Sequence, residues 1–438
     1  MDNSVVNTEA YSRLVKLYDN GVFTEIDSYA KSKNGDTEVV AGFGYVNGAP
    51  CYAFSQNVEV NNGAITVAQC AKLKKIYDMA VKTGYPVIGI YDSNGVMLTE
   101  GFEALSAYGE IVKASTSVSG VVPQISVIAG ACLGTSALIA NMADVVVAVK
   151  DADFYISCPS DTTVEESARA GVVDIVADDI DSAISSAKSI IAMLPENNIS
   201  IAPVLDFSAP DTVPCVGADA KEIVDAIADA GSVIELKENY GSNLITALAT
   251  VNGTTVGFVA FDGNAICPKC AYKAEAIIKL CDAYNLPIIT IANADGVIKD
   301  NDAQTLVATT KLTSAYATAT CPKISLITGQ SIGTAYIILA GKGANADLTL
   351  AWDNAVTSPL DVDSAVAFLY NDRLSAGEDR ATLEAEYKDT IGSAFSAAAC
   401  GAVDDIFAAA DTRSKVIAAL EMLYSKRETT IARKHSVK

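Results

Sequence analysis

The most constraining feature of this sequence is that it repeats itself. Residues 123–140 read PQISVIAGACLGTSALIA, and residues 322–339 read PKISLITGQSIGTAYIIL, in one register 199 positions apart. Two shorter matches lie upstream, at offsets of 201 and 205 positions, and they keep the same order along the chain. Chance similarity does not preserve both order and spacing. The sequence therefore predicts an internal duplication of a unit of about 200 residues.

Each copy has the pattern of an α/β unit. Short runs rich in β-branched residues have the length of buried strands, and longer segments have the length and apolar spacing of helices. The predicted strands are residues 87–91, 125–129, 288–292 and 324–328, and the predicted helices are residues 67–83 and 271–284.

Three further segments need an interpretation. The apolar stretches 121–149 and 324–351 are interrupted by Pro or Gly and by polar residues, so we expect each to be a strand followed by a buried helix rather than a membrane span. Residues 372–387 form an amphipathic, charged segment that occurs only in the second copy, where we predict a solvated helix.

A segment rich in Pro, Asn and Ser, residues 194–218, interrupts the pattern between the two copies. Such a composition is typical of a connection between domains. We predict an N-terminal domain at residues 1–205, a linker with a connecting helix at residues 206–235, and a C-terminal domain at residues 236–438.

The composition excludes several kinds of chemistry. The chain has 31 Lys and Arg against 53 Asp and Glu, a net charge of −22. This charge disfavours a nucleic acid or an anionic membrane as partner, because binding them requires basic side chains. The single histidine, His435, lies in a charged tail at the C-terminus, so we exclude catalytic triads and zinc sites that need a histidine in the folded body.

The ten cysteines are predicted to be reduced thiols of a cytoplasmic protein, because residues 1–11 do not form an apolar leader. Cys267 and Cys270 form the one CxxC pair and resemble half of a zinc site. No second pair and no nearby histidine complete four ligands, so we expect core-filling thiols and no metal.

In both copies a predicted strand runs into the motif Gly-x-x-x-Gly-Thr and then into an apolar helix, at residues 130–135 and 329–334. Glycine permits a sharp turn, and the first N–H groups of a helix have no intrahelical partner. Two such groups can hold an oxyanion, for instance the enolate of a thioester. The same motif also serves close helix packing, but its duplication suggests that two carbonyl-type oxygens are stabilised in one reaction.

Further segments carry a resemblance to a known family. They are residues 54–56, 62–63, 91–95, 100–109 and 119–125 in the first copy, and 273–274, 281–287, 322–324, 333–336 and 412–435 in the second. In this order, from about residue 42 onwards, they resemble the carboxyltransferase subunit of biotin-dependent acyl-CoA carboxylases. That family includes acetyl-, propionyl- and methylmalonyl-CoA enzymes, transcarboxylase, and decarboxylases linked to sodium pumps.

The resemblance implies two tandem crotonase-like domains, each an α/β superhelix of ββα repeats, with the active site between the N-terminal domain of one subunit and the C-terminal domain of its partner. It implies a homo-oligomer, either a dimer or a hexamer built as a trimer of dimers. The implied reaction moves a carboxyl group between biotin on a separate carrier protein and the α-carbon of a small acyl-CoA, without a metal in this chain or a side-chain base. The implied partners are the biotin carboxyl carrier protein and either a biotin carboxylase or a membrane decarboxylase subunit.

The resemblance also implies site residues. The catalytic candidates are the two turns, whose backbone N–H groups hold the reacting oxygens: Gly134, Thr135, Gly333 and Thr334. The substrate-binding candidates are Asn94, Gly95, Val96, Gly130, Ala131, Cys132, Asp295, Gly296, Ala335, Tyr336 and Ile337. The sequence does not tell which turn serves which oxygen.

The chain departs from the family pattern where the second glycine of each turn is replaced by Thr135 and Thr334. Threonine retains the backbone donor at a negative φ, but its branched side chain adds bulk beside the oxyanion. Arginines of the family pattern are also missing, at Met97 and at Gly329, which weakens cationic binding of CoA or of a carboxylate.

Three alternatives therefore stay open. In the first, the chain is a catalytically degenerate subunit that binds CoA or the carrier and pairs with an active paralogue. In the second, it is the decarboxylating subunit of a sodium-pump acyl-CoA decarboxylase. In the third, it is a biotin-independent hydrolase or isomerase of the crotonase type. The absence of placed acid–base pairs counts against the last of these.

Overall fold

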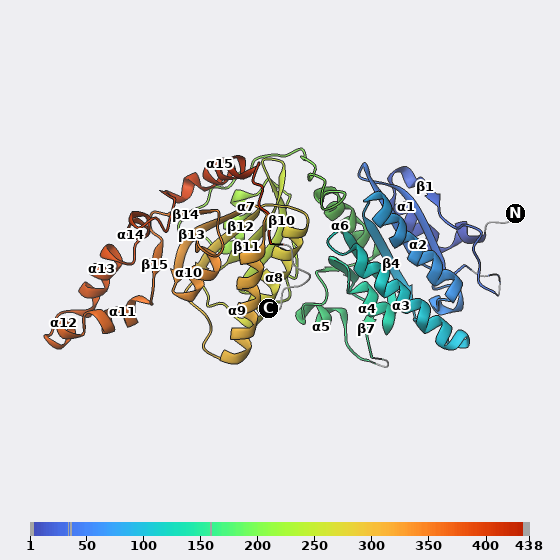
Figure 1. The fold of residues 1–438 in the computed structure, drawn as a ribbon, viewed down its shortest axis with the longest axis horizontal. Coiled ribbons are helices and arrows are strands. Elements are labelled where there is room, and N and C mark those ends of the chain that lie inside the picture. Colours follow the sequence, from blue (N-terminus) through green and yellow to red (C-terminus); the bar gives the residue numbers. More distant parts are fainter. Residues whose placement is uncertain (1–3, 34, 36, 158–159, 432–438) are drawn as a thin grey trace. The chain divides into compact units, whose positions relative to one another are not determined.

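The computed structural model describes residues 4–33, 35, 37–157 and 160–431, and it divides into two compact units (Figure 1). The first unit comprises Met1–Pro203 with Lys237–Tyr240, and the second comprises Val204–Leu236 with Gly241–Lys438. Helix α7 (Ala220–Ile227), in the segment expected to connect the domains, packs into the core of the second unit.

The first unit is built on an eight-stranded sheet in the order β1-β2-β3-β4-β5-β6-β8, with β7 paired to β5. Strands β1 to β3 pair antiparallel, and the ladder from β3 to β8 is parallel. The strands are β1 (Phe23–Glu25), β2 (Val39–Val46), β3 (Ala49–Gln56), β4 (Val87–Ser93), β5 (Gln124–Leu133), β6 (Val145–Val149), β7 (Asp153–Tyr155) and β8 (Ile175–Ala177). The helices are α1 (Glu9–Leu17), α2 (Val67–Thr83), α3 (Gly101–Val118), α4 (Thr135–Ala140), α5 (Val164–Arg169) and α6 (Ile180–Met193).

The second unit repeats this topology in the order β16-β14-β13-β12-β11-β10-β9, with β15 paired to β13, which confirms the predicted duplication. Its strands are β9 (Ile234–Glu235), β10 (Leu244–Val251), β11 (Thr254–Phe261), β12 (Ile288–Ala294), β13 (Lys323–Ile332), β14 (Leu348–Trp352), β15 (Val356–Ser358) and β16 (Asp405–Phe407). Besides α7, its helices are α8 (Pro268–Ala283), α9 (Asp302–Thr318), α10 (Thr334–Leu339), α11 (Val362–Leu369), α12 (Asn371–Ser375), α13 (Arg380–Thr390), α14 (Ala394–Ala399) and α15 (Thr412–Leu423).

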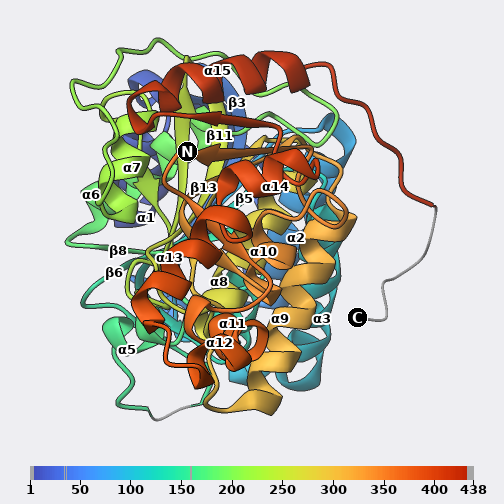
Figure 2. The ribbon, with the colours of Figure 1, turned by 90° about the vertical axis from the view of Figure 1, so that its left-hand side faces the viewer.

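Helices cover both faces of each sheet. In the first unit, α2 and α3 pack against one face, while α1 and α6 contact strands β2, β3, β5 and β6. In the second unit, α7 and α15 bury one face, and the paired helices α8 and α9 lie on the other side of the sheet (Figure 2). Since both faces are covered, every residue of β4 is buried, which explains the continuous apolar runs in the sequence.

The predicted strands and helices are confirmed, with boundaries shifted by a few residues. The apolar stretches 121–149 and 324–351 each contain a long strand followed by a short helix, as expected. No described helix is long and apolar enough to cross a membrane.

The prediction of one solvated helix at residues 372–387 is wrong. The segment contains two helices, α12 and α13, and Gly377 between them has a φ of +91°, which breaks the helix. Leu383 and Tyr387 of α13 are buried in a small apolar cluster with Val366 of α11, so this region has a core of its own.

Candidate active site

The two Gly-x-x-x-Gly-Thr motifs form strand-to-helix turns with the same backbone geometry. Strand β5 ends at Leu133 and α4 begins at Thr135, while β13 ends at Ile332 and α10 begins at Thr334. The residues between them, Gly134 and Gly333, have φ, ψ of 60°, −126° and 54°, −120°. Side chains rarely tolerate this conformation, so glycine is required at both positions.

The glycine of each turn does not offer its own N–H group. Gly134 N–H donates to the carbonyl of Tyr155 at 3.1 Å, and Gly333 N–H donates to the carbonyl of Ser358 at 2.8 Å. The next N–H groups, on Thr135 and Thr334, are the first of their helices and bond to no described residue. We expected both residues of each turn to supply an N–H donor, but only the N–H groups of the threonines remain available. The φ angles of these threonines are not positive.

A second turn lies beside the first in each unit. Ser93 of β4 pairs with Cys132 of β5, and two residues beyond them the chain reaches Gly95 and Gly134. A Cβ built on Gly95 would lie 3.7 Å from the carbonyl oxygen of Leu133, which places the two turns side by side. In the second unit Ala294 pairs with Ser331, and the chain reaches Gly296 and Gly333 two residues beyond this pair.

In this second turn the N–H group of Val96 bonds to no residue that the structure describes. The residues on either side of Val96 bond to Ile65: Gly95 accepts from Ile65 N–H at 2.9 Å, and Met97 N–H donates to the carbonyl of Ile65 at 3.0 Å. In such a parallel bridge the central residue directs its own N–H away from the partner, here toward the β5 side. The N–H groups of Val96 and Thr135 thus lie on neighbouring turns, and neither bonds to a described residue.

The second unit reproduces this arrangement around Val297. Ile266 N–H donates to the carbonyl of Gly296 at 3.0 Å, and Ile298 N–H donates to Ile266 at 3.1 Å. Each unit thus presents two N–H groups on neighbouring turns, Val96 with Thr135 and Val297 with Thr334.

In each unit a side chain at the end of β4 or β12 accepts a hydrogen bond from the backbone that leads into the turn. Asp92 Oδ1 accepts from Ala131 N–H at 3.2 Å, and Asn293 Oδ1 accepts from Gln330 N–H at 3.0 Å. A Cβ at Gly130 would collide with Asp92, as would one at Gly329 with Asn293. The first glycine of each motif is therefore set by close packing on this supporting side chain.

The support differs in charge between the two units. Arg13 of α1 donates to Asp92 Oδ2 at 2.7 Å, and both side chains are at most 10% exposed, whereas Asn293 is neutral. Sequence reasoning missed Arg13 and the role of Asp92. The repeat contained a signal, because Asp92 and Asn293 align at the 201-residue offset, but nothing in the sequence linked Asp92 to a residue 79 positions away.

A buried lysine also occupies the same place in both units. Lys72 of α2 donates to the carbonyl of Val39 at 2.8 Å, and Lys273 of α8 donates to that of Leu244 at 2.7 Å. Burial lowers the pKa of Lys72, and a glutamate of the edge strand, Glu25, lies 4.0 Å away and opposes this shift. These lysines tie a helix to its sheet and were not identified as site residues from the sequence.

The remaining candidates are placed as follows. Cys132 and Ala335 are buried, so their side chains are not available to a ligand, whereas Asn94 and Asp295 are exposed. The Tyr336 hydroxyl donates to the carbonyl of Ala402 at 3.1 Å. Its neighbour Ile337 is 53% exposed beside the second turn.

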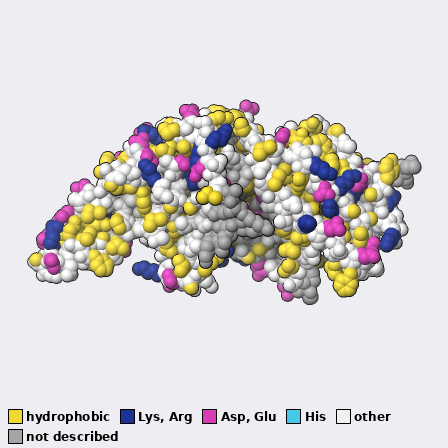
Figure 3. Space-filling view, in the orientation of Figure 1, with side chains coloured by type: hydrophobic (Ala, Val, Ile, Leu, Met, Phe, Trp, Pro, Cys, Tyr) yellow, Lys and Arg dark blue, Asp and Glu magenta, His cyan; other side chains and the backbone are white. Residues whose placement is uncertain are grey.

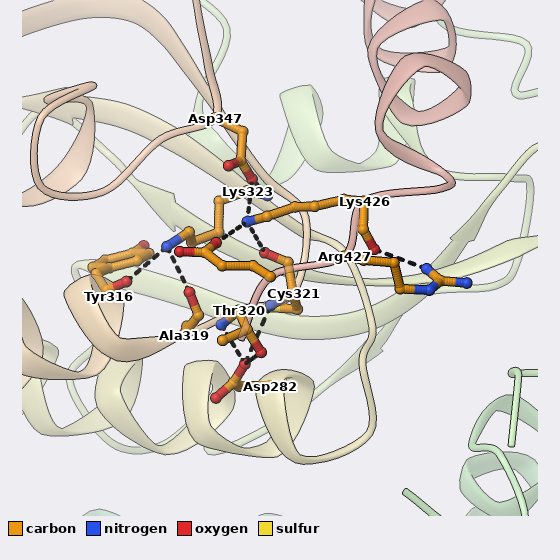
Figure 4. Close-up of polar contacts among 10 residues, drawn as sticks. Asp282, Tyr316, Ala319, Thr320, Cys321, Lys323, Asp347, Lys426 and Arg427 are labelled. Atoms are coloured by element: carbon orange, nitrogen blue, oxygen red, sulfur yellow. Dashed lines mark hydrogen bonds and ion pairs between the residues drawn. The ribbon is translucent and has the colours of Figure 1, made fainter. Parts of the chain in front are cut away.

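Another polar cluster lies at the opposite end of β13 and has a structural role (Figure 4). Lys323 donates to the carbonyls of Tyr316 and Ala319 at 2.9 and 2.8 Å, and burial together with the nearby Lys426 lowers its pKa. Lys426, beyond α15, binds the carbonyl of Cys321 at 3.0 Å and Asp347 at 2.9 Å. Lys426 thus fixes the segment after α15 to the end of the sheet at which β13 begins.

The structure adds little to the question of metals. Within the described ranges no group of three or more His, Cys, Asp or Glu side chains could hold a metal ion. His435, the residue used to exclude histidine chemistry, lies outside the described residues.

Comparison with known proteins gives one consistent result. Residues 7–438 match the carboxyl transferase domain family. The chain is 31% identical to the methylmalonyl-CoA carboxyltransferase 12S subunit of Propionibacterium freudenreichii subsp. shermanii, over 97% of this chain and 90% of the relative. It is 32% identical to the propionyl-CoA carboxylase beta chain of Saccharopolyspora erythraea, over 97% and 89%.

Two further similarities bear on the reaction and the fold. The chain is 30% identical to the methylmalonyl-CoA decarboxylase subunit alpha of Propionigenium modestum, over 97% of this chain and 92% of the relative. It superposes on a crystal structure of the transcarboxylase 12S hexamer, with methylmalonyl-CoA and methylmalonic acid bound, with a TM-score of 0.91 and 28% identity. That match covers 99% of this chain and 93% of the other.

Proposed function

The chain belongs to the carboxyl transferase family and is a carboxyltransferase of the biotin-dependent acyl-CoA carboxylase type, and on this premise we propose that its substrates are biotin on a separate carrier protein and a small acyl-CoA of the propionyl and methylmalonyl class. It consists of two crotonase-like domains, as the resemblance implied. The relatives named for propionyl-CoA and methylmalonyl-CoA support this choice of acyl group.

The observation that carries the proposal is the duplicated pair of N–H groups. The reaction has two carbonyl-type oxygens on which negative charge develops, that of the thioester and that of the biotin ureido group. The chain has two matching donor pairs, Val96 with Thr135 and Val297 with Thr334. One such donor is typically worth about 10²–10³ in rate, so the backbone alone supplies a large part of the stabilisation.

The same geometry supports an active enzyme rather than a degenerate subunit. The threonine of each turn is a helical residue with its N–H group at the helix start, so the change from glycine does not remove the donor. The special backbone conformation falls on Gly134 and Gly333, which are retained.

We further propose that the active site is completed between subunits. Apolar side chains are exposed in both units: Phe102 and Leu138 are 89% and 44% exposed in the first unit, and Ile337 and Phe368 are 53% and 78% exposed in the second. Figure 3 shows hydrophobic side chains gathered over the α11–α13 region. Such surfaces mark interaction sites, and they fit a homo-oligomer in which the first unit of one subunit faces the second unit of its partner. The relative of known structure is described as a hexamer.

The relatives include carboxylases, a transcarboxylase and decarboxylases. The donor pairs stabilise the same two oxygens in either direction of carboxyl transfer. The physiological direction therefore depends on the partner that loads or unloads the biotin carrier, a biotin carboxylase or a membrane decarboxylase subunit.

The proposal can be tested with free biotin as the acceptor. Purified protein is mixed with methylmalonyl-CoA and biotin, and biotin-dependent formation of propionyl-CoA is measured. We expect turnover with methylmalonyl-CoA, and none without biotin. A protein that binds methylmalonyl-CoA without biotin-dependent turnover would support the degenerate-subunit alternative instead.

The variant Thr135→Pro sharpens this test. Proline is favoured at the first position of a helix and lacks the backbone N–H group, so the turn should fold while this donor and the threonine hydroxyl are lost. We expect kcat to fall by about 10²–10³. The control Thr135→Ala loses the hydroxyl, as proline does, but keeps the N–H group and should retain activity; equal activity in the two variants would show that this N–H group is not used.

A further inference from the structure

Two thiols meet at the start of helix α8. Cys267 and Cys270 lie with their Sγ atoms 2.7 Å apart, which is inside van der Waals contact and a short movement from the S–S bond length of about 2.05 Å. Cys267 is the N-cap of α8, and its Sγ accepts from Cys270 N–H at 3.2 Å. The two sulfurs therefore need only a short movement to reach bonding distance.

The two sulfurs have different environments. Cys267 is partly exposed and Cys270 is buried. The Cys270 S–H group and the N–H groups at the helix start donate to Cys267 and lower its pKa to about 6, while the same contact and burial raise the pKa of Cys270. A thiolate that solvent can reach, next to a protonated thiol that it cannot, is the arrangement of an attacking and a resolving cysteine.

The other buried thiols do not share this environment. Burial raises the pKa of Cys51, Cys70, Cys132, Cys281 and Cys321. In the first unit, the positions aligned with the pair at the 201-residue offset are Thr66 and Gln69. The thiol pair is thus specific to the second unit and is not required by the fold, since α2 forms without it.

The pair adjoins a turn of the candidate active site. Ile266, directly before Cys267, donates to the carbonyl of Gly296 at 3.0 Å and accepts from Ile298 N–H at 3.1 Å. The Val297 N–H group lies between these two bonds. A covalent constraint on Cys267 therefore acts one residue away from the segment that holds this donor.

We propose that Cys267 and Cys270 form a reversible redox site that exchanges with low-molecular-weight disulfides and that restrains the Gly296–Val297 turn when oxidised. The Cys267 thiolate attacks one sulfur of the incoming disulfide, whose S–S bond breaks and releases one thiolate, which takes a proton from solvent. Cys270 then loses its proton, its sulfur attacks Cys267, and the second thiol leaves. In total the protein loses two protons and two electrons, and the small disulfide gains them to become two thiols.

The experiment uses the full chain and oxidised glutathione. After incubation, free thiols are blocked with iodoacetamide and the protein is digested with trypsin, which cuts after Lys269 and so separates the two cysteines. An internal disulfide joins peptide 238–269 to peptide 270–273. We expect this joined pair to increase at least about tenfold over a sample kept in dithiothreitol, and to disappear when dithiothreitol is added back.

Two variants test the assigned roles. Cys270→Ser should trap glutathione on Cys267, whereas Cys267→Ser should leave Cys270 unmodified because the attacking thiolate is gone. Serine is a good N-cap, so the second variant should fold. Cys215→Ser, which removes an exposed cysteine elsewhere in the second unit, is the control and should form the joined pair like the parent chain.

The link to the turn is read by hydrogen exchange, independently of carboxyl transfer. Oxidation should slow exchange of the amides of residues 296–298 in the parent chain and leave the aligned residues 95–97 unchanged. Failure to form the joined peptides in excess oxidised glutathione, with the fold intact by circular dichroism, would overturn the redox site. Formation of the disulfide without slower exchange at 296–298 would overturn its effect on the turn.

Discussion

The two units share a backbone and differ in the side chains that hold it. Both place a glycine in the same unusual conformation at the turn, and both rest that turn on the side chain at the end of β4 or β12. That side chain is Asp92 paired with Arg13 in the first unit and the neutral Asn293 in the second. The N-cap residues of α2 and α8 also differ between the units. In the first unit Thr66 caps α2 and bonds to Glu38 at 2.9 Å, and in the second unit Cys267 caps α8.

This comparison shows which features the duplication has preserved. Main-chain geometry and the N–H groups of the turns are the same, while charge and side-chain chemistry behind them differ. Such a pattern is expected where the chemistry uses backbone donors, because a side chain can then change as long as the turn keeps its shape.

The largest effect is expected from removing the charge partner in the first unit. Arg13→Met leaves the buried Asp92 carboxylate unpaired, and we expect the free energy of unfolding to fall by about 3–5 kcal/mol in urea denaturation. The double variant Arg13→Met with Asp92→Asn copies the second unit and should recover most of this loss. If the double variant is no more stable than the single one, the two supports are not equivalent.

The turns themselves should be equally sensitive in both units. Gly134→Val and Gly333→Val force a side chain into a φ of 60° or 54°, which should displace the donors and lower kcat for free biotin by at least about 10²-fold. The control Gly217→Val also lies at a positive φ, 89°, but in an exposed loop, and should keep its activity. Loss of activity in only one of the two variants would show that the two turns do not contribute equally to catalysis.

An intermediate effect is expected at the thiols that only the second unit has. Cys270→Ala removes the S–H donor that stabilises the Cys267 thiolate, so the pKa of Cys267 should rise from about 6. Measured as the pH midpoint of Cys267 alkylation, the rise should be at least about 1 unit. Because this pKa is lowered in the folded state, the stability it contributes is present above the unfolded pKa and is lost as pH falls through 6. An unchanged midpoint would show that Cys270 does not stabilise the Cys267 thiolate.

The smallest effect is expected where both units differ from their family. Thr135→Gly and Thr334→Gly restore the family residue and keep the N–H group, so kcat should stay within a factor of about three or increase. Stability should fall by no more than about 1 kcal/mol, the usual difference for glycine in a helix. A large loss of activity would show that the threonine side chains take part in the site.

Much of this protein could be predicted from its sequence because the deciding information is local or repeated. The strands and helices follow from short apolar patterns, and the helix predicted at residues 67–83 is α2 itself. The duplication fixed the order of elements in both units, and the Gly-x-x-x-Gly-Thr motifs located both turns. The solvated helix expected at residues 372–387 failed because its buried side chains contact α11, a partner that periodicity alone does not reveal.

The sequence by itself determined the two-fold repeat, the α/β class and the position of the turns, since each depends on neighbouring residues or on matching segments. The tertiary structure decided which atoms are free to act. Gly134 loses its N–H group to Tyr155, 21 residues along the chain, and Asp92 acquires Arg13 from another helix. A backbone N–H group can bind a ligand only when it is not already bonded to an acceptor within the protein. The position of that acceptor depends on parts of the chain that are distant in sequence.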